Sequence, residues 1–304
     1  GTYGCVYKPA YPCSKSKRTF SEKDMVGKIF NDKESFLREK QIMKKINKID
    51  RNQLFTLKMV TYCDEVILNK MKSKCKNIKN NGKHYQIVYT NGGMNLCKYF
   101  QKEYDFYQLY VGILALAKGL VILETHQLCH RDIKEANITV QSNKMYLIDF
   151  GLTIPYRKIY NNEEDIILNF DYPYYPPEFK IYYDLKRLNE IVDINRLRKR
   201  ILKHVLKNYK EFYDTYAIEN TVMTFIESMK RLTIDGLKKD LINHANKIDI
   251  FGYGMVMMKL LMNSKAGNNK QKKQMFLILK DCIDPNPFTR LSPKELVNRL
   301  LIEI

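Results

Sequence analysis

Two spacings of apolar residues alternate along the chain and predict its strands and helices. Short runs of strand composition cover residues 24–30, 84–90 and 144–148. Residues 35–46 carry apolar side chains at a helical spacing, and residues 109–126 form a longer stretch of the same kind, so we predict a helix in each. Polar motifs lie at the ends of these predicted elements.

One predicted hairpin separates two of these motifs. Residues 138–140 and 144–148 read as paired strands, and residues 141–143 are the turn between them. A hairpin of this kind brings Asn137 and Asp149 to the same end. Their amide and carboxylate oxygens are the ligand type that Mg²⁺ prefers, so both residues can reach one metal cluster.

Further polar residues precede the hairpin. Asp132 lies five residues before Asn137 and can accept the hydrogen bond of an acceptor hydroxyl, and Lys134 can contact a transferring phosphate. Taken singly, a His-Arg-Asp string is usually a solvated loop and an Asp-Phe-Gly string is usually a turn. The string 130–137 followed after 11 residues by 149–151, in strand–turn–strand context, is far more specific.

These strings resemble the motifs of the eukaryotic-type protein kinases. Residues 130–137 match H-R-D-x-x-x-x-N, residues 149–151 match D-F-G, and residues 176–178 match A-P-E with Pro176 in place of Ala. The resemblance implies a two-lobed α+β fold with a small β-rich N-lobe and a larger helical C-lobe. It also implies ATP and Mg²⁺ as cofactors. By the same resemblance Asp132 is the catalytic base, Lys134 is the phosphate contact typical of serine/threonine rather than tyrosine kinases, and Asn137 and Asp149 hold magnesium.

The N-terminal part agrees with this resemblance. Gly1, Gly4 and Val6 match the end of G-x-G-x-x-G-x-V, whose first glycine is missing, so we expect the sequence to begin inside a domain. Lys28 fits the lysine of V-A-I-K, with Val26 and Gly27 replacing the Ala and Ile, and Lys23 is a weaker candidate.

Glu39 on the predicted helix is the natural partner of Lys28, and Glu34 is the alternative. Residues 91–93 would be the hinge between the lobes. Asp249 opens a segment resembling D-x-W-S-x-G and would brace the backbone of the catalytic loop. Arg290 would pair with Glu178. We therefore predict one incomplete kinase domain over 1–304, with lobes at 1–91 and 92–304.

Two departures from the family pattern stand out. Asp171 occupies the place, seven residues before Glu178, where a threonine normally bridges the base and the loop lysine, and it would add negative charge near Asp132. We interpret the nearby tyrosines as packing residues and hydroxyl anchors, although Arg131 can receive a phosphate from this loop. The tyrosines are residues 156, 160, 172, 174 and 175.

The second departure is a predicted helical, basic insertion over residues 184–246. Its lysines and arginines crowd residues 196–210, which can bind an acidic partner, and nucleic acid is not excluded. We prefer a solvated helix face with an apolar side beneath it. The basic residues are Arg196, Arg198, Lys199, Arg200, Lys203, Lys207 and Lys210.

Composition limits the choice of partners and compartment. The 304 residues include 52 basic and 33 acidic ones, and the net charge of +19 favours acidic partners. Seven cysteines without a C-x-x-C pair fit reduced thiols of an intracellular protein. No signal peptide or 18-residue apolar run appears, so we expect no membrane span. The many Lys, Asn, Ile and Tyr residues suggest an AT-rich coding genome. Residues 4–10 and the insertion resemble those of kinases of large DNA viruses, and an AT-rich protist fits the composition as well.

The sequence therefore predicts an ATP-dependent kinase that phosphorylates Ser or Thr hydroxyls of proteins. The first alternative is a pseudokinase or scaffold that holds a partner through the basic insertion. The second is a kinase of small molecules, against which the Pro-Pro-Glu string, Asp249 and Arg290 argue.

Overall fold

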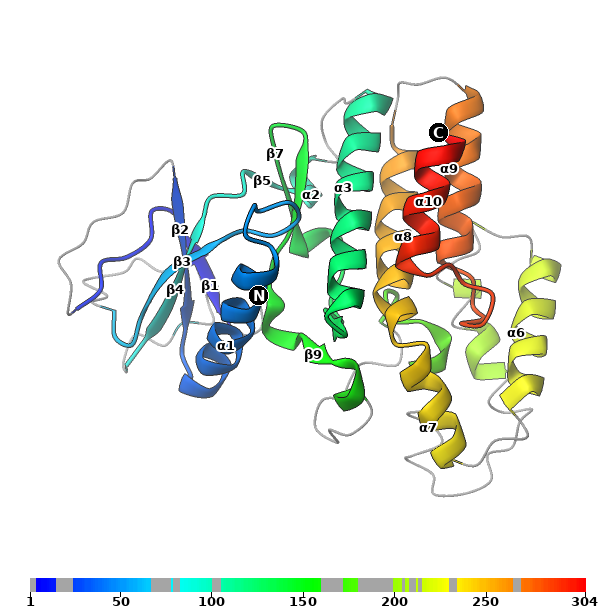
Figure 1. Ribbon diagram of the computed structural model, residues 1–304, viewed down its shortest axis with the longest axis horizontal. Helices are drawn as coiled ribbons and strands as arrows, with labels where there is room; N and C mark the ends of the chain where they lie inside the picture. Colours follow the sequence, from blue (N-terminus) through cyan, green and yellow to red (C-terminus); the bar gives the residue numbers. More distant parts are fainter. Residues whose placement is uncertain are drawn as a thin grey trace. The chain divides into compact units, whose positions relative to one another are not determined.

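The computed structural model divides the chain into two compact units, the first made of residues 1–99 with 136–152 and the second of 100–135 with 153–304 (Figure 1). The first unit contains an antiparallel sheet and the second is larger and helical, so the predicted two-lobed α+β fold is confirmed. The predicted lobe bounds at residue 91 stay a prediction. The structure describes residues 4–14, 24–66, 78, 83–99, 105–159, 172–179, 199–203, 206–207, 212, 215–229, 234–264 and 269–304.

The sheet of the first unit has the strand order β1-β2-β4-β3, and all its pairs are antiparallel. Lys28 pairs with Val6 on one side and with Ile87 on the other, which places it in the middle of the sheet. The strands are β1 (Cys5–Tyr7), β2 (Met25–Phe30), β3 (Met59–Cys63) and β4 (Tyr85–Thr90).

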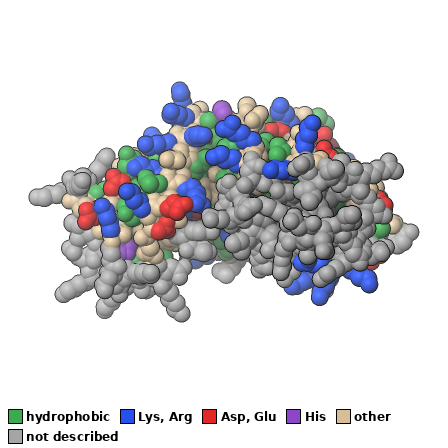
Figure 2. Space-filling model, turned by 90° about the horizontal axis from the view of Figure 1, so that it is seen from below, with side chains coloured by type: hydrophobic (Ala, Val, Ile, Leu, Met, Phe, Trp, Pro, Cys, Tyr) green, Lys and Arg blue, Asp and Glu red, His purple; other side chains and the backbone are tan. Residues whose placement is uncertain are grey.

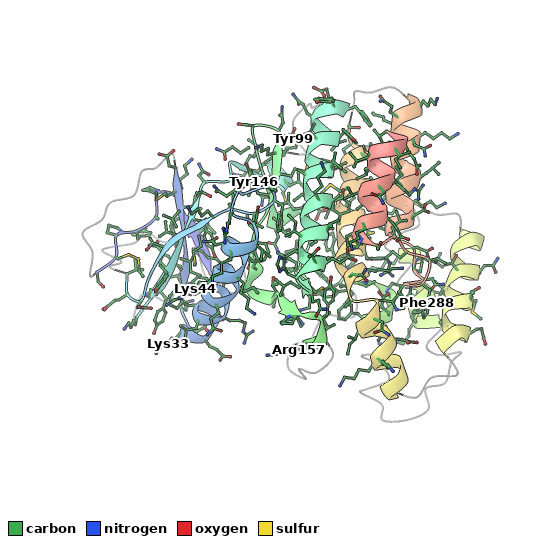
Figure 3. The ribbon with its side chains drawn as sticks, viewed as in Figure 1. Lys33, Lys44, Tyr99, Tyr146, Arg157 and Phe288 are labelled. Carbon is green, nitrogen blue, oxygen red and sulfur yellow. A yellow bond between two sulfur atoms is a disulfide. The ribbon has the colours of Figure 1, made fainter. Side chains whose placement is uncertain are left out.

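Helix α1 (Lys33–Ile49) packs against this sheet. Its start is fixed by Asp32, whose side chain accepts a hydrogen bond from the Ser35 backbone N–H at 2.7 Å. Its exposed face carries lysines, including Lys33 and Lys44 (Figure 3). Its inner face follows the predicted helical spacing and buries Phe36, Glu39, Ile42, Met43 and Ile46.

The predicted hairpin is confirmed as β7 (Ile138–Gln141) and β8 (Lys144–Leu147), joined by a two-residue turn. Ser142 and Asn143 form the turn with φ of 49° and 63°, the left-handed conformation that Asn tolerates well in tight hairpins. The short strand β5 (Met94–Asn95) pairs with β7 and leads into α2 (Leu96–Tyr99).

The core of the second unit is built around α8 (Asn246–Met262). Figure 1 shows α3 (Phe106–Thr125), α8, α9 (Asn269–Cys282) and α10 (Pro293–Glu303) side by side. Almost every residue of α8 from Ile248 to Leu261 is buried, which is the pattern of a helix enclosed on all sides. The remaining described elements are β6 (Leu128–Cys129), η1 (Glu135–Asn137), η2 (Phe150–Leu152), β9 (Ile154–Pro155), η3 (Tyr156–Lys158), α6 (Thr215–Met229) and α7 (Ile234–Asn243).

Helix α3 is, among the described residues, the one helix long and apolar enough to cross a membrane by length and composition. Half of the apolar window is buried inside the protein, and core helices pass the same test, so the finding is weak support for a membrane span. Within the second unit, α3 packs against α8 and α10.

The predicted basic insertion is described only in part. Its described segments include α6 and α7, whereas Arg196, Arg198 and Lys210 lie outside the described residues. On the face drawn in Figure 2, Lys and Arg side chains lie in several separate places among acidic and hydrophobic ones. The Lys and Arg side chains of the described residues on that face therefore form several separate groups.

The expectation of reduced cysteines is wrong for part of the first unit. Cys13 and Cys63 form a disulfide, with their Cα atoms 5.4 Å apart. Cys13 forms a β-bridge with Val66, so backbone pairing brings together two cysteines that lie 50 residues apart in the sequence. Cys5 is disulfide-bonded as well. Cys97, Cys129 and Cys282 are the free thiols among the described residues.

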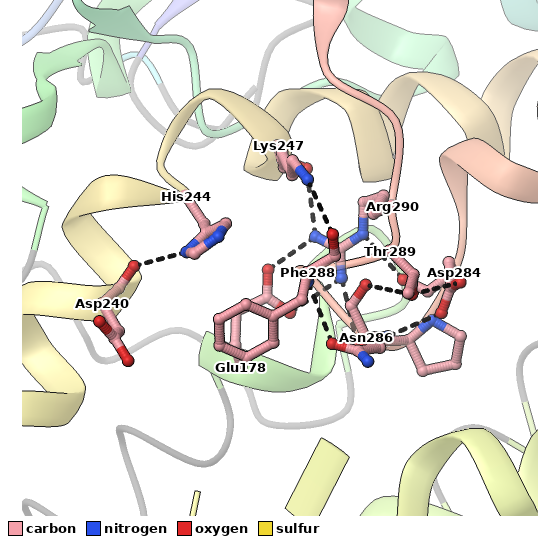
Figure 4. Close-up of polar contacts among 10 residues, drawn as sticks. Glu178, Asp240, His244, Lys247, Asp284, Asn286, Phe288, Thr289 and Arg290 are labelled. Atoms are coloured by element: carbon pink, nitrogen blue, oxygen red, sulfur yellow. Dashed lines mark hydrogen bonds and ion pairs between the residues drawn. The ribbon is translucent and has the colours of Figure 1, made fainter. Parts of the chain in front are cut away.

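The predicted pair of Glu178 and Arg290 is confirmed as a buried bidentate salt bridge. The two terminal nitrogens of the Arg290 guanidinium, Nη1 and Nη2, donate to the two Glu178 oxygens at 2.6 and 2.9 Å. Remaining guanidinium donors bind the backbone carbonyls of Asp284, Lys247 and Pro285 (Figure 4). The pair ties the Pro-Pro-Glu segment to the loop before α10.

We predict that Arg290→Met lowers the free energy of unfolding by about 3–5 kcal/mol, because it leaves the buried Glu178 carboxylate without its cation. Arg299→Met is the matched control. Arg299 bonds Asp281 and Glu303 with a partly exposed side chain, so its loss should cost at most about 1 kcal/mol. Denaturant unfolding measures both, and equal losses would contradict the importance of burial.

Candidate active site

Three charged side chains meet inside the first unit, each from a different element. Lys28 comes from β2, Glu39 from α1, and Asp149 follows β8. The Lys28 ammonium donates to Glu39 Oε2 at 2.6 Å and to Asp149 Oδ1 at 2.8 Å. The structure therefore joins the predicted lysine to its predicted glutamate and to the predicted metal ligand. The alternative Glu34 bonds Arg38 at the surface.

Burial controls the charges in this trio. Burial lowers the pKa of Lys28, but the carboxylates of Glu39 and Asp149 outweigh it, and the net pKa is raised. Burial raises the pKa of Glu39, and Lys28 offsets this only in part. The Tyr89 hydroxyl donates to Glu39 Oε1 at 2.7 Å, and burial followed by the Glu39 charge raises the pKa of Tyr89. Tyr89 thus stays a neutral donor that fixes Glu39.

The two predicted metal ligands are held at one end of the hairpin. The backbone N–H of Ile148 donates to the Asn137 carbonyl at 2.9 Å, which fixes the separation of the two strands there. Asp149 has a φ of 64°, and 28% of its side chain is exposed, whereas the side chains of Lys28 and Glu39 are nearly enclosed. The trio contains two carboxylates, of Glu39 and Asp149, and one ammonium, of Lys28. Its excess negative charge is therefore accessible at Asp149, the most exposed of the three side chains. Oxygen ligands and this charge fit Mg²⁺.

The glycine-rich segment lies on the edge strand of the same sheet. A Cβ atom on Gly4 would lie 2.4 Å from the Ile29 carbonyl oxygen, so only glycine allows β1 to approach β2 this closely. Val6 is 62% exposed, an unusual position for an apolar strand residue and one that suits a side chain covered by a ligand. Gly1 lies outside the described residues, and so does Lys23.

Gly27 departs from the family pattern, and Gln86 explains why. A Cβ atom on Gly27 would lie 2.2 Å from Gln86 Oε1. The Gln86 amide instead fills this space, accepting from the Tyr11 N–H at 2.9 Å and donating to the Tyr11 carbonyl at 2.7 Å. The amide thereby holds the segment that follows β1 on the sheet.

We predict that Gly27→Ala lowers the free energy of unfolding by about 1–3 kcal/mol, because the new methyl group displaces the Gln86 amide. The same substitution made in a Gln86→Ala background should cost less than about 1 kcal/mol. Denaturant unfolding of the four proteins measures the difference. Equal costs in both backgrounds would show that Gln86 does not set the identity of residue 27.

Residues 130–135 of the catalytic loop belong to the second unit, where Asp249 braces the loop backbone as predicted. The Asp249 carboxylate accepts the backbone N–H of His130 at 2.6 Å and that of Arg131 at 2.9 Å. Burial raises the pKa of Asp249, while His130 and the backbone hydrogen bonds act in the opposite direction. Arg131 has a φ of 64°, so the loop turns sharply where these bonds hold it. The loop geometry therefore depends on a buried carboxylate.

The side chain of Asp132, the predicted base, accepts hydrogen bonds from Lys134 and Tyr172. The Lys134 ammonium donates to both Asp132 oxygens, at 2.9 and 2.8 Å. The Tyr172 hydroxyl donates to Asp132 Oδ1 at 2.8 Å. Burial, followed by the Asp132 charge, raises the pKa of Tyr172, which keeps this hydroxyl protonated. Asp171, which is expected near this group, lies outside the described residues.

Tyr174 and Tyr175 act as predicted, as a hydroxyl anchor and a packing residue, whereas Tyr160 lies outside the described residues. The Tyr174 hydroxyl donates to Glu135, which also accepts from the Lys259 ammonium at 3.1 Å. The Tyr175 side chain is buried and packs against Phe179 with ring centroids 5.5 Å apart. These contacts attach the catalytic loop to the segment before Glu178.

Sequence patterns missed Tyr89 and Gln86, and they identified Tyr172 only as a packing residue or hydroxyl anchor, without its contact to Asp132. Assigning the strand register finds the first, because Val26 pairs with Tyr89 and Lys28 pairs with Ile87. In an antiparallel pair this places Tyr89 on the same face of the sheet as Lys28. Tyr172 lies in an irregular segment, where no periodicity indicates the direction of a side chain.

A family model described as protein tyrosine and serine/threonine kinase matches residues 1–187 of the chain. The match includes the glycine-rich segment, Lys28, the catalytic loop and the Pro-Pro-Glu string, which are the residues assembled above. The chain belongs to this family of protein kinases. A search of curated proteins finds no significant match, so the comparisons give the expected viral source no support.

Proposed function

We propose that this protein kinase transfers the γ-phosphate of ATP, with Mg²⁺, to Ser and Thr hydroxyls of protein substrates. The observation that carries the proposal is the Lys134 ammonium bound to both oxygens of Asp132. A lysine two residues after the base can neutralise charge on the transferring phosphoryl group while the base accepts the hydroxyl proton. By the resemblance described above, serine/threonine kinases have a lysine at this place.

Residues of the first unit would bind the nucleotide. Lys28, held by Glu39, would contact the α- and β-phosphates, and Gly4 and Val6, with Gly1 before them, would cover the nucleotide. Asn137 and Asp149 would hold Mg²⁺, which when bound neutralises the phosphate oxygens. The Lys28 contact with Asp149 supports this assignment because it joins the phosphate-binding and metal-binding groups.

Asp132 would orient the acceptor hydroxyl and take its proton as the oxygen bonds to the γ-phosphorus and ADP leaves. The bonds from Asp249 to the loop backbone would hold Asp132 in place for this step. Most of the rate enhancement in phosphoryl transfer comes from such positioning and from charge neutralisation.

The net charge of +19 favours acidic protein substrates or partners, and residues 196–210 are the proposed place where such a partner binds. An intracellular location remains part of the proposal.

We predict that Asp132→Asn lowers kcat for protein phosphorylation by about 10²–10⁴-fold, because the amide cannot accept the hydroxyl proton. Nucleotide binding, measured as the rise in unfolding temperature with ATP and Mg²⁺, should survive. Asp281→Asn is the control, since Asp281 is an exposed carboxylate paired with Arg299. Radiolabel transfer to a panel of acidic and basic proteins measures the rates.

Equal turnover by the Asp132→Asn variant would overturn the assigned role of Asp132. Nucleotide binding by the unaltered chain without transfer to any protein would favour the pseudokinase or scaffold alternative. Transfer to tyrosine alone, seen by phosphoamino-acid analysis of the labelled proteins, would contradict the Ser/Thr assignment.

A further inference from the structure

The Tyr172 hydroxyl contacts the side chain that the proposed function makes the catalytic base. It donates to Asp132 Oδ1 at 2.8 Å, across a separation of 40 residues in the sequence. The Lys134 ammonium lies 5.7 Å from the centroid of the Tyr172 ring, on the edge of cation–π range. Base, lysine and tyrosine thus form one cluster within the second unit.

Tyr172 differs from Lys134 in what holds it. Lys134 belongs to the same loop as Asp132, so the two move together. The Tyr172 ring instead packs against the rings of Tyr174 and Tyr175, with centroids 5.3 and 4.7 Å away. Tyr175 in turn packs against Phe179, the neighbour of the buried Glu178.

A chain of rigid contacts therefore links Asp132 to the core of the second unit. The Glu178–Arg290 salt bridge fixes one end of the aromatic stack, and the Tyr172 hydroxyl is the other end. Aromatic side chains have few rotatable bonds, and packed rings lose the remaining freedom. A hydroxyl held in this way can fix the orientation of the carboxylate that it binds.

Charge in the cluster supports the same role. Burial and the nearby Asp132 charge raise the pKa of Tyr172, so the hydroxyl remains a donor at neutral pH. A neutral donor orients the carboxylate without supplying a second counter-charge beside Lys134. The adjacent residue, Asp171, is a carboxylate in the sequence and has no hydroxyl hydrogen to donate when ionised.

We propose that Tyr172 is a positioning residue of the transfer reaction, whose hydroxyl holds the Asp132 carboxylate in the orientation needed to accept the substrate proton. This inference rests on the proposed function, since it gives Asp132 the role of the base. It assigns to Tyr172 a contribution to kcat rather than to substrate binding.

The Tyr172–Asp132 contact could instead inhibit the reaction, and that role predicts a different result. A hydroxyl that occupied the place of the acceptor would block the reaction, and its removal would raise the rate. The packing of Tyr172 in the aromatic stack favours the positioning role, because a blocking group must leave before each turnover.

The first test compares Tyr172→Phe with the unaltered protein in steady-state phosphorylation of a protein acceptor. The variant keeps the ring and loses one hydrogen bond to a charged group, so kcat should fall about tenfold to a hundredfold. KM for ATP and for the acceptor should stay within about twofold. An unchanged kcat, a raised kcat or a loss confined to KM would overturn the proposal.

Tyr253→Phe is the matched control. Tyr253 also lies in the second unit and its buried hydroxyl donates to the Ile113 carbonyl at 2.9 Å. Its removal also costs one hydrogen bond, so the protein should lose stability while kcat stays within about twofold. If kcat fell equally in both variants, the effect of Tyr172→Phe would reflect a general loss of structure. That result would overturn the proposal.

The second test needs no phosphoryl transfer. Denaturant midpoints are measured without nucleotide for Tyr172→Phe, Asp132→Ala and the double variant. The double variant should shift the midpoint by clearly less than the sum of the single shifts, because both remove the same hydrogen bond. Additive shifts would overturn the proposed contact.

The two tests separate the two proposals. An inactive unaltered protein with coupled midpoints would contradict the proposed kinase function and leave the Tyr172–Asp132 contact established. An active protein with additive midpoints would contradict the role of Tyr172 and leave the kinase function intact.

Discussion

Burial of carboxylates is the constraint on which the described structure depends. Glu39, Asp50, Glu178 and Asp249 are each at most 7% exposed. A buried carboxylate is unfavourable unless its oxygens accept hydrogen bonds or meet a cation. Each of these four has such partners, and in each case the partners come from segments with little regular structure of their own or from a distant element. The hydrogen bonds and ion pairs of these carboxylate oxygens therefore hold the irregular segments of the folded chain in place.

Asp50 shows how far this effect reaches inside the first unit. Its carboxylate accepts the backbone N–H groups of Leu54, Phe55 and Thr56 at 2.7 to 3.1 Å, which shapes the turn after α1. The Phe55 carbonyl from this turn accepts the Leu147 N–H at 2.7 Å. Leu147 ends β8, two residues before Asp149. A buried carboxylate far in sequence from the predicted metal ligands Asn137 and Asp149 thus helps to hold the hairpin between them.

The sequence allowed prediction of those parts of the site that regular spacing determines. Asn137 and Asp149 flank a hairpin whose turn residues are recognisable, and the pairs Lys28–Glu39 and Glu178–Arg290 follow from motifs in the expected order. The Cys13–Cys63 disulfide was not predicted, because it depends on how two segments 50 residues apart pair. Gln86 was missed, and the contact of Tyr172 with Asp132 was not predicted, because both depend on where a side chain points, which neither spacing nor residue type determines.

The structure helps to explain two local departures from the family pattern, at residues 27 and 171. The explanation is of the same kind in both cases. Glycine stands at residue 27 where the family has a larger side chain, and the Gln86 amide from the neighbouring strand fills that space. A hydroxyl is expected at residue 171, and the hydroxyl that reaches Asp132 belongs to the next residue, Tyr172. In both cases a neighbour supplies the volume or the donor that the local geometry needs. At such places a position-by-position motif comparison shows only that the expected residue is absent. The contacts in the structure show which neighbouring side chain replaces it.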